Sequence, residues 1–208
     1  MAQSVLPGSA YQDFAKQDYL YLIENVRFKA LRFAKLKSTA QLEEWRAQSQ
    51  RITSAVNIVE DWRKTCIEDL KIPASEMKNI EPSAAQIGYA SFLNGQTILD
   101  DWFSLYITTI PCIYGWSQIA KRLDEDPRTD HGTPFYKTFI KPNLESESAK
   151  KLCQFIEANR KFWSSGVTEN VWNTLFRTAL KFEIALFDSV LVERADFALP
   201  PDGINRNN

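Results

Sequence analysis

Residues 10–37 read AYQDFAKQDYLYLIENVRFKALRFAKLK, and this stretch decides the fold class. Its apolar side chains recur at steps of three, four and seven residues, with lysine and arginine between them, which is the spacing of one face of an α-helix. The apolar positions are Tyr11, Phe14, Tyr21, Leu22, Phe28, Leu31 and Phe33. We therefore predict one long amphipathic helix here, with these residues on its apolar face.

The rest of the chain continues the helical pattern. Capping signatures at Ser38-x-x-Gln41 and Ser83-x-x-Gln86 mark two helix starts, and Thr133-Pro134 marks a brief helical turn. Further helices are predicted over 42–70, with Ile52, Val56, Val59 and Cys66 on one stripe, and over 84–109, 112–123, 144–163 and 168–193. No repeat and no alternating strand pattern is present, so the chain is predicted to be an all-α, multi-helix bundle. Bundles build ligand sites from side chains on facing helices, so any site should be internal.

Composition limits the classes of function. The chain has 208 residues, 44% of them hydrophobic and 25% charged, which predicts one globular domain over 1–208 with a frayed tail from about 195. Lys and Arg number 25 against 26 Asp and Glu, so no field attracts nucleic acid or an anionic membrane. The chain has seven glycines and neither a G-x-G-x-x-G nor a P-loop motif, which excludes those two kinds of nucleotide site.

Cysteine usage and hydropathy predict a cytoplasmic protein. The three cysteines, Cys66, Cys112 and Cys153, are odd in number and form no C-x-x-C, and the first residues show no secretion signal. Residues 102–120, WFSLYITTIPCIYGWSQIA, carry no formal charge and approach the length of a membrane span. Because polar residues and Pro111 interrupt them, we predict a buried helix pair and no span.

The single histidine supports no metal or cofactor. His131 lies in the acidic loop DEDPRTDHG, where Asp126 and Asp130 could join it as metal ligands. One imidazole with loop carboxylates is a weak ligand set, so a solvated loop is the favoured interpretation. Di-iron bundles and globin-like haem sites need helix-borne histidines, so we predict no metal and no cofactor.

Three side chains are candidates for catalysis. Cys112 follows Pro111 at the start of a predicted helix, where the helix dipole would lower the thiol pKa, whereas Cys66 and Cys153 are typical of small buried hydrophobes. Glu183 and Asp18 lie among apolar neighbours, so each is either a structural ion-pair member or a tuned acid or base. The pattern does not decide between these roles. The aromatic residues Tyr21, Tyr89, Tyr114 and Trp116 are either core residues or walls of a pocket for a flat ring.

Several segments of the sequence, taken together, resemble a known protein family. The matching segments are Gln17-Asp18-Tyr19-Leu20-Tyr21-Leu22, Glu81-Pro82-Ser83 with Tyr89, Ile110-Pro111-Cys112 with Tyr114-Gly115-Trp116, Thr133-Pro134-Phe135-Tyr136, and Glu183-Ile184-Ala185-Leu186-Phe187-Asp188. In order and spacing, over nearly the whole chain, they resemble the TenA/thiaminase II family. The resemblance implies a haem-oxygenase-like α-bundle that assembles as a homo-oligomer, usually a homotetramer.

The resemblance also implies a function. It implies a salvage hydrolase that acts on aminopyrimidines from degraded thiamin, or on thiamin itself. Carried over by position, Cys112 is the nucleophile that adds to the pyrimidine ring, and Glu183 protonates the leaving amine. Asp18 holds the ring's amino group and nitrogen, while Tyr21 and Tyr89 pack against the ring and hydrogen-bond it.

The sequence departs from the family pattern at three pocket positions. Asn143 stands where the family has a tyrosine, Trp116 replaces another tyrosine, and Leu186-Phe187 replaces Phe-Trp. We expect Trp116, Asn143 and Leu186 to line the substrate pocket. Two alternatives stay open: a TenA-like enzyme for another heteroaromatic or secondary-metabolite substrate, and a non-catalytic helical protein that binds a small molecule.

Overall fold

The computed structural model describes residues 8–37, 40 and 42–190 of the chain, and all regular structure in them is helical. The α-helices are α1 (Gly8–Ala34), α2 (Leu42–Glu68), α3 (Ala84–Leu99), α4 (Ser104–Ile107), α5 (Trp116–Glu125), α6 (Lys141–Asn143), α7 (Glu147–Trp163) and α8 (Gly166–Asp188). A 3₁₀ turn, η1 (Glu76–Lys78), and two π-helical turns, η2 (Pro111–Gly115) and η3 (Tyr136–Ile140), connect them. The prediction of an all-α fold is confirmed.

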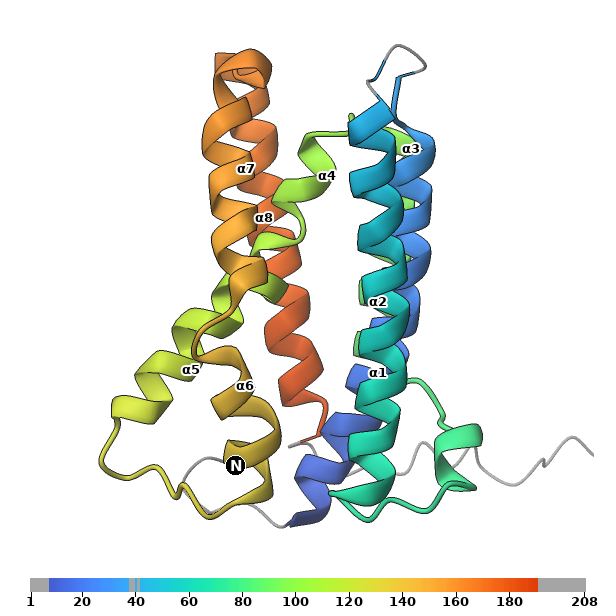
Figure 1. The fold of residues 1–208 in the computed structure, drawn as a ribbon, viewed down its shortest axis with the longest axis vertical. Helices are drawn as coiled ribbons and strands as arrows, with labels where there is room; N and C mark the ends of the chain where they lie inside the picture. The colour runs from blue at the N-terminus through green and yellow to red at the C-terminus, as the bar shows by residue number, and fades with distance from the viewer. Residues whose placement is uncertain (1–7, 38–39, 41, 191–208) are drawn as a thin grey trace, which may run out of the picture.

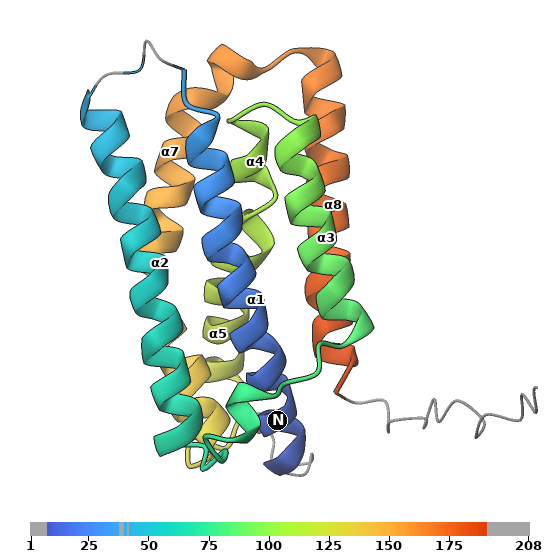
Figure 2. The same cartoon turned by 90° about the vertical axis from the view of Figure 1, so that its right-hand side faces the viewer.

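Helix α1 is at the centre of the bundle. It packs against α2, α3 and α8, and Figure 2 shows α2, α1 and α3 in one row with α4, α5 and α7 behind them. Helix α8 packs against α3, α4 and η2 (Figure 1), and Figure 2 shows α7 and α8 apart, with α4 and α5 between them. Among the described residues, none of the helices has the length and apolar character needed to cross a membrane.

Two of the predicted helix starts, at Ser83 and Thr133, are confirmed by their caps. The Ser83 hydroxyl accepts a hydrogen bond from the Gln86 amide at 3.1 Å, and the Thr133 hydroxyl accepts one from the Tyr136 amide at 3.0 Å. Ser165 forms a capping box with Thr168 at the start of α8. The proposed Ser38-x-x-Gln41 cap, the end predicted for the last helix and the tail from about 195 lie outside the described residues.

The predicted helix over 84–109 is wrong in its second half. Helix α3 ends at Leu99, and a new start follows because the Asp101 carboxylate accepts hydrogen bonds from the amides of Phe103 and Ser104 at 2.8 and 2.9 Å. The Trp172 indole then donates to the Ser104 hydroxyl at 2.9 Å and ties α4 to α8. The break turns the chain so that η2 faces α8.

The predicted apolar faces of the two long helices are also partly wrong. On α1, Leu31 is 39% exposed while its neighbour Arg32 is 4% exposed; on α2, Val56 is 40% exposed and Gln48 is buried. Three helices surround α1, so its buried stripe is wide and includes polar side chains. This inward polar stripe carries Asp18, Tyr21, Asn25, Lys29 and Arg32 at steps of three and four residues.

The core contains two clusters of buried apolar side chains. One packs around Phe14, Cys66 and Phe139 near the start of α1. The other packs around Tyr21, Tyr89 and Leu186, with Cys112 and Phe182 against it. Several residues that the sequence analysis assigned to a site therefore meet in the second cluster.

Candidate functional site

Glu183 of α8 is the most constrained side chain of the site. Its Oε1 accepts a hydrogen bond from the Tyr89 hydroxyl of α3 at 2.7 Å, and its Oε2 accepts one from the Trp116 indole of α5 at 3.1 Å. The residue is 7% exposed, and burial raises the pKa of the carboxyl group, while the hydrogen bonds act in the opposite direction. A buried carboxylate with a donor on each oxygen is fixed in one orientation.

Cys112 of η2 lies next to this carboxylate. Its thiol is within hydrogen-bonding reach of Glu183, and the Tyr21 hydroxyl is within reach of its sulfur. Burial, followed by the charge of Glu183, raises the thiol pKa well above its ordinary value. The thiol is therefore protonated at neutral pH, with a base beside it.

The expectation of a lowered thiol pKa at Cys112 is wrong. The residue does not begin a helix, because Ile110 is already helical and the Ile113 amide donates to the Thr109 carbonyl at 3.0 Å. No free helix N-terminus faces the sulfur, so the dipole that the prediction relied on is missing. The nearby carboxyl groups have the opposite effect on the pKa.

Asp18 of α1 is the second carboxyl group of the site. Burial first, and then the charge of Glu183, raise its pKa to about 8. The group is therefore largely protonated at neutral pH and can both donate and accept a hydrogen bond. Asp18, Cys112 and Glu183 thus interact electrostatically with one another, and their catalytic roles stay predictions.

Aromatic rings form the walls around these groups. The Tyr21 ring stacks on Tyr89 with centroids 4.8 Å apart, and Phe182 stacks on the other side of Tyr89 at 5.5 Å. Leu186 is buried in the same cluster, whereas the Trp116 ring packs against Phe187 at 4.5 Å. Tyr21, Tyr89 and Leu186 therefore pack in one cluster, where their role as pocket walls stays a prediction, and Trp116 holds Glu183.

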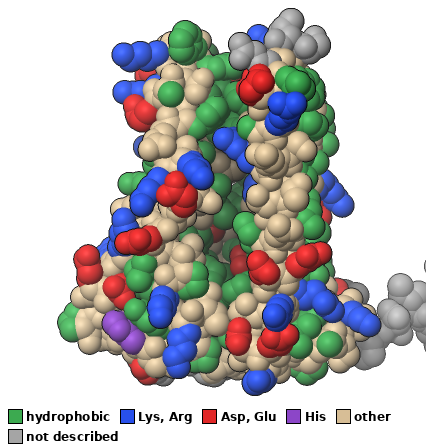
Figure 3. All heavy atoms as spheres, viewed as in Figure 1, with side chains coloured by type: hydrophobic (Ala, Val, Ile, Leu, Met, Phe, Trp, Pro, Cys, Tyr) green, Lys and Arg blue, Asp and Glu red, His purple; other side chains and the backbone are tan. Residues whose placement is uncertain are grey.

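Asp18 and Cys112 are half-buried, and burial is the largest cause of the pKa shift of each. Figure 3 shows the molecule hollowed between α2 and α7, with hydrophobic side chains on the walls of this groove.

Asn143 is not joined to the other predicted site residues. Its side-chain amide donates to the Phe139 carbonyl at 2.8 Å, within the helical segment that ends in α6. Among the described residues, its side chain forms no hydrogen bond with Cys112 or Glu183. A pocket role for Asn143 stays a prediction.

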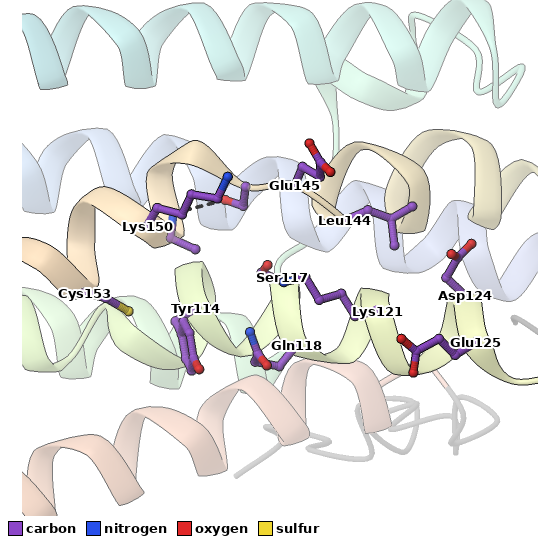
Figure 4. Close-up of a pocket in the computed structure, with 12 residues that line it drawn as sticks. Tyr114, Ser117, Gln118, Lys121, Asp124, Glu125, Leu144, Glu145, Lys150 and Cys153 are labelled. Carbon is purple, nitrogen blue, oxygen red and sulfur yellow. Dashed lines mark hydrogen bonds between the residues drawn. The ribbon is translucent and has the colours of Figure 1, made fainter.

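Two other features lie apart from the site. Figure 4 shows a second pocket between α5 and the start of α7, lined by Tyr114, Ser117 and Cys153 among others, and it includes none of the predicted catalytic residues. His131 is exposed and stacks on Tyr136 at 4.1 Å. Both features belong to the surface.

The sequence analysis missed two basic residues on the inward stripe of α1. Lys29 interacts electrostatically with both Cys112 and Arg32, and burial is the main cause that lowers its pKa to about 8. Both were assigned to the charged side of an amphipathic helix. Their steps of three and four residues from Tyr21 are the signal that could have placed them beside it.

The chain matches a known protein family over most of its length. Residues 1–192 match the TENA/THI-4/PQQC family. The chain belongs to this family. Its resemblance to TenA proteins, first seen in short motifs, thus extends over the whole described bundle.

Two relatives match most of the length of the chain. An aminopyrimidine aminohydrolase of Halalkalibacterium halodurans is 30% identical over 193 residues, which cover 91% of this chain and 84% of that protein. An uncharacterized protein of Haemophilus influenzae is 28% identical over 195 residues, covering 90% of this chain and 86% of that one.

Solved structures confirm the fold. The TenA homologue from P. horikoshii OT3 superposes with a TM-score of 0.74 at 19% identity, covering 91% of this chain and 85% of that one. The TenA homologue from Pyrococcus furiosus superposes with a TM-score of 0.74 at 18% identity, covering 91% of this chain and 87% of that one. The bundle is therefore haem-oxygenase-like, as the resemblance implied.

Proposed function

We propose that the protein is an aminopyrimidine hydrolase of the thiaminase II type, with Cys112 as nucleophile and Glu183 as acid and base. The observation that carries the proposal is the Cys112 thiol beside a buried carboxylate whose two oxygens are held by Tyr89 and Trp116. The 30% identical aminopyrimidine aminohydrolase supports the same chemistry. Salvage of thiamin-derived pyrimidines is the corresponding metabolic role.

The first step is addition of sulfur to the ring. Because the thiol pKa is high, Cys112 needs a base, and Glu183 accepts its proton as the carbon–sulfur bond forms. The displaced electron pair moves to a ring nitrogen, which takes the proton of Asp18. The raised pKa values of both carboxyl groups suit them to exchange protons near neutral pH.

The second half-reaction releases the amine. Glu183 donates its proton to the leaving nitrogen as the carbon–nitrogen bond breaks, and the Asp18 carboxylate offsets the positive charge left on the ring. Water then adds to the vacated carbon and gives a proton to Glu183. Departure of the sulfur restores the ring, the thiol recovers its proton from Glu183, and the ring nitrogen returns the other proton to Asp18. The balance is one water consumed and one amine released.

Asp18 also supports recognition of an aminopyrimidine. A ring nitrogen beside an exocyclic amino group offers one acceptor and one donor, and a protonated carboxyl group offers one donor and one acceptor. The two edges are complementary. The stacked faces of Tyr21 and Tyr89 add flat apolar surface of the kind that binds such a ring.

The test is release of ammonia from 4-amino-5-aminomethyl-2-methylpyrimidine by the purified protein. We expect turnover by the wild type and a loss of at least about 100-fold in Cys112→Ser and in Glu183→Gln. Cys153→Ser, which changes a thiol in the second pocket, is the matched control and should keep full activity.

Two results would contradict the proposal. Full activity in Cys112→Ser removes this residue as nucleophile. If the wild type is folded but shows no turnover, the site must bind a different heteroaromatic ligand. The substitutions at Trp116 and Leu186, where the family has other residues, would then account for the changed specificity.

We further propose that the chain forms a homo-oligomer, a tetramer or a dimer, in the cytoplasm. Exposed apolar side chains on α3 and around α8 support association of copies: Ile87, Ile98, Leu99, Val167, Val171, Leu180 and Ile184. The three cysteines are free thiols, which supports a reducing compartment. Light scattering after gel filtration tests the assembly, and a monomer at micromolar concentration would contradict it.

A further inference from the structure

A second set of buried polar side chains lies beyond the catalytic groups on α1. Arg32 is 4% exposed, and its side chain has no hydrogen bond or ion pair to any described residue. Its Nε is buried without a partner. A buried guanidinium that lacks a partner is unfavourable unless a ligand supplies one.

Tyr106 of α4 organises the surroundings of this guanidinium. The Arg32 guanidinium carbon lies 3.9 Å from the centroid of the Tyr106 ring, which leaves the N–H donors at the edge of the guanidinium plane free. Arg51 of α2 donates to the Tyr106 hydroxyl at 2.6 Å, and that hydroxyl donates to Gln48 at 3.0 Å. Two arginines from different helices are thus fixed on one tyrosine.

Lys29 completes a cluster of three cations. The charges of Arg32 and Arg51 both disfavour the charged form of Lys29, and the charge of Arg51 disfavours that of Arg32. Among the described residues, no carboxylate forms an ion pair with any of the three. Like charges held together without a counter-charge attract an anion.

The cluster adjoins the catalytic site and keeps an opening. Lys29 interacts electrostatically with both Cys112 and Arg32, so the cluster is close to the catalytic site. Lys29 and Arg51 keep accessible surface, and Arg51 also lies over the Phe155 ring of α7, at 5.6 Å. The cluster therefore lies between α2 and α7, where Figure 3 shows the groove with Lys or Arg side chains in its upper part.

We propose that Lys29, Arg32 and Arg51 form a binding site for a small oxyanion, a phosphate or carboxylate group, beside the Cys112 pocket. The planar N–H edges of the two arginines suit the oxygens of such a group, and the lysine ammonium adds a point charge. Side chains of an α-helix lean toward its N-terminus, so Lys29 and Arg32 lean toward Tyr21 and the pocket.

The first experiment measures binding of inorganic phosphate to the full chain by calorimetry at low ionic strength. We expect saturable binding that weakens at least about tenfold in Arg32→Gln and in Arg51→Gln. Arg27→Gln is the matched control, because Arg27 lies on the same helix with a 62% exposed side chain paired to Glu24. Lys29→Gln serves as a further variant should removal of Arg32 disturb folding, which circular dichroism checks.

The binding measurements either support the oxyanion site or overturn it. Loss of affinity in the cluster variants with unchanged affinity in Arg27→Gln supports the site. Absence of saturable phosphate binding by the folded wild type, or equal affinity in all variants, overturns it. Since ammonia release is not measured, failure here is distinct from failure of the proposed reaction.

A second comparison distinguishes two sources of the anion. If the group is carried by a ligand of the Cys112 pocket, the phosphate ester of hydroxymethylpyrimidine should bind at least about tenfold more tightly than the free alcohol, and Arg32→Gln should abolish the difference. Equal affinities for ester and alcohol, with inorganic phosphate binding intact, assign the site to a free ion. Either result is compatible with the oxyanion site. Only tighter binding of the ester depends on the proposed function.

Discussion

Glu183 shows how single residues set the chemistry of the site. Burial favours its protonated form, whereas the Tyr89 hydroxyl and the Trp116 indole favour the carboxylate. The balance leaves the pKa raised. Loss of either donor should therefore shift the balance further toward the protonated form.

Trp116→Phe tests this balance, because it keeps an aromatic ring and removes the indole N–H. The hydrogen bond from the indole lowers the pKa of Glu183, so its removal should raise that pKa further. The proposed first step needs the carboxylate, so the acid limb of the pH profile of kcat/KM should move to higher pH. Ammonia release as a function of pH measures the shift.

Trp102→Phe is the matched control for this change. Its indole nitrogen is buried without a hydrogen-bond partner, and its ring packs on Tyr106 and Phe155, away from Glu183. The control should leave the acid limb in place. An unshifted limb in Trp116→Phe would show that the indole does not tune Glu183.

Single residues also mark how far sequence reasoning reaches. Apolar neighbours singled out Asp18 and Glu183, and the structure brings both beside Cys112. The role of Trp116 was missed, because periodicity shows which face a side chain is on and not which atom it contacts. Arg32 was missed for a different reason: a helix surrounded on three sides buries positions that a single amphipathic face would expose.

Among the elements, α3 offers a comparison between two glycines. A Cβ at Gly95 would have no heavy atom within 4 Å, while a Cβ at Gly88 would lie 3.0 Å from the Phe182 ring. Glycine within a helix is about 0.8–1.0 kcal/mol less favourable than alanine. Gly95→Ala should therefore stabilise the protein by about that amount.

Gly88→Ala should not give the same gain, because Phe182 must move from its stacked position on Tyr89. Overpacking of this kind costs about 1–3 kcal/mol, so the net change should be destabilising. Urea unfolding of the two variants beside the wild type gives both values. Equal stabilisation by both substitutions would mean that the Phe182 contact has no energetic weight.

Helix ends were the least predictable property of the elements. Starts at Ser83 and Thr133 have local capping chemistry that the sequence displays, and they were predicted, whereas α8 starts at Gly166 after a Ser165 cap that was not predicted. The end of α3 depends on hydrogen bonds from the Asp101 side chain to two amides, which compete with a helical pattern that otherwise continues. Such competition is visible only once the chain conformation is known.

The whole molecule should respond to pH through Asp18. Its pKa is about 8 in the folded state against 3.8 ordinarily, so the folded state binds the proton more tightly. Its contribution to stability is fully present below pH 3.8 and is lost as pH rises through about 8. Folding stability attributable to this group therefore declines from acid to alkaline pH.

Asp18→Asn removes this dependence while keeping the shape of the side chain. We expect the variant to melt about 5 °C or more above the wild type at pH 9, with a much smaller difference at pH 5. Thermal unfolding followed by circular dichroism at the two pH values measures it. Asp61→Asn, at an exposed position of α2, should give the same small change at both, and a pH-independent effect of Asp18→Asn would contradict the argument.

The π-helical turn η2 has a consequence for how the site can be lost. A π turn holds one residue more than the α-helical ladder around it would use. Deletion of a single residue such as Ile113 would remove the extra residue, so that the turn returns to ordinary helical spacing and the helices before and after it keep their register. The change would then fall on the turn itself, which carries Cys112. One in-frame codon deletion would thus move the nucleophile relative to Glu183, with no change to any catalytic side chain.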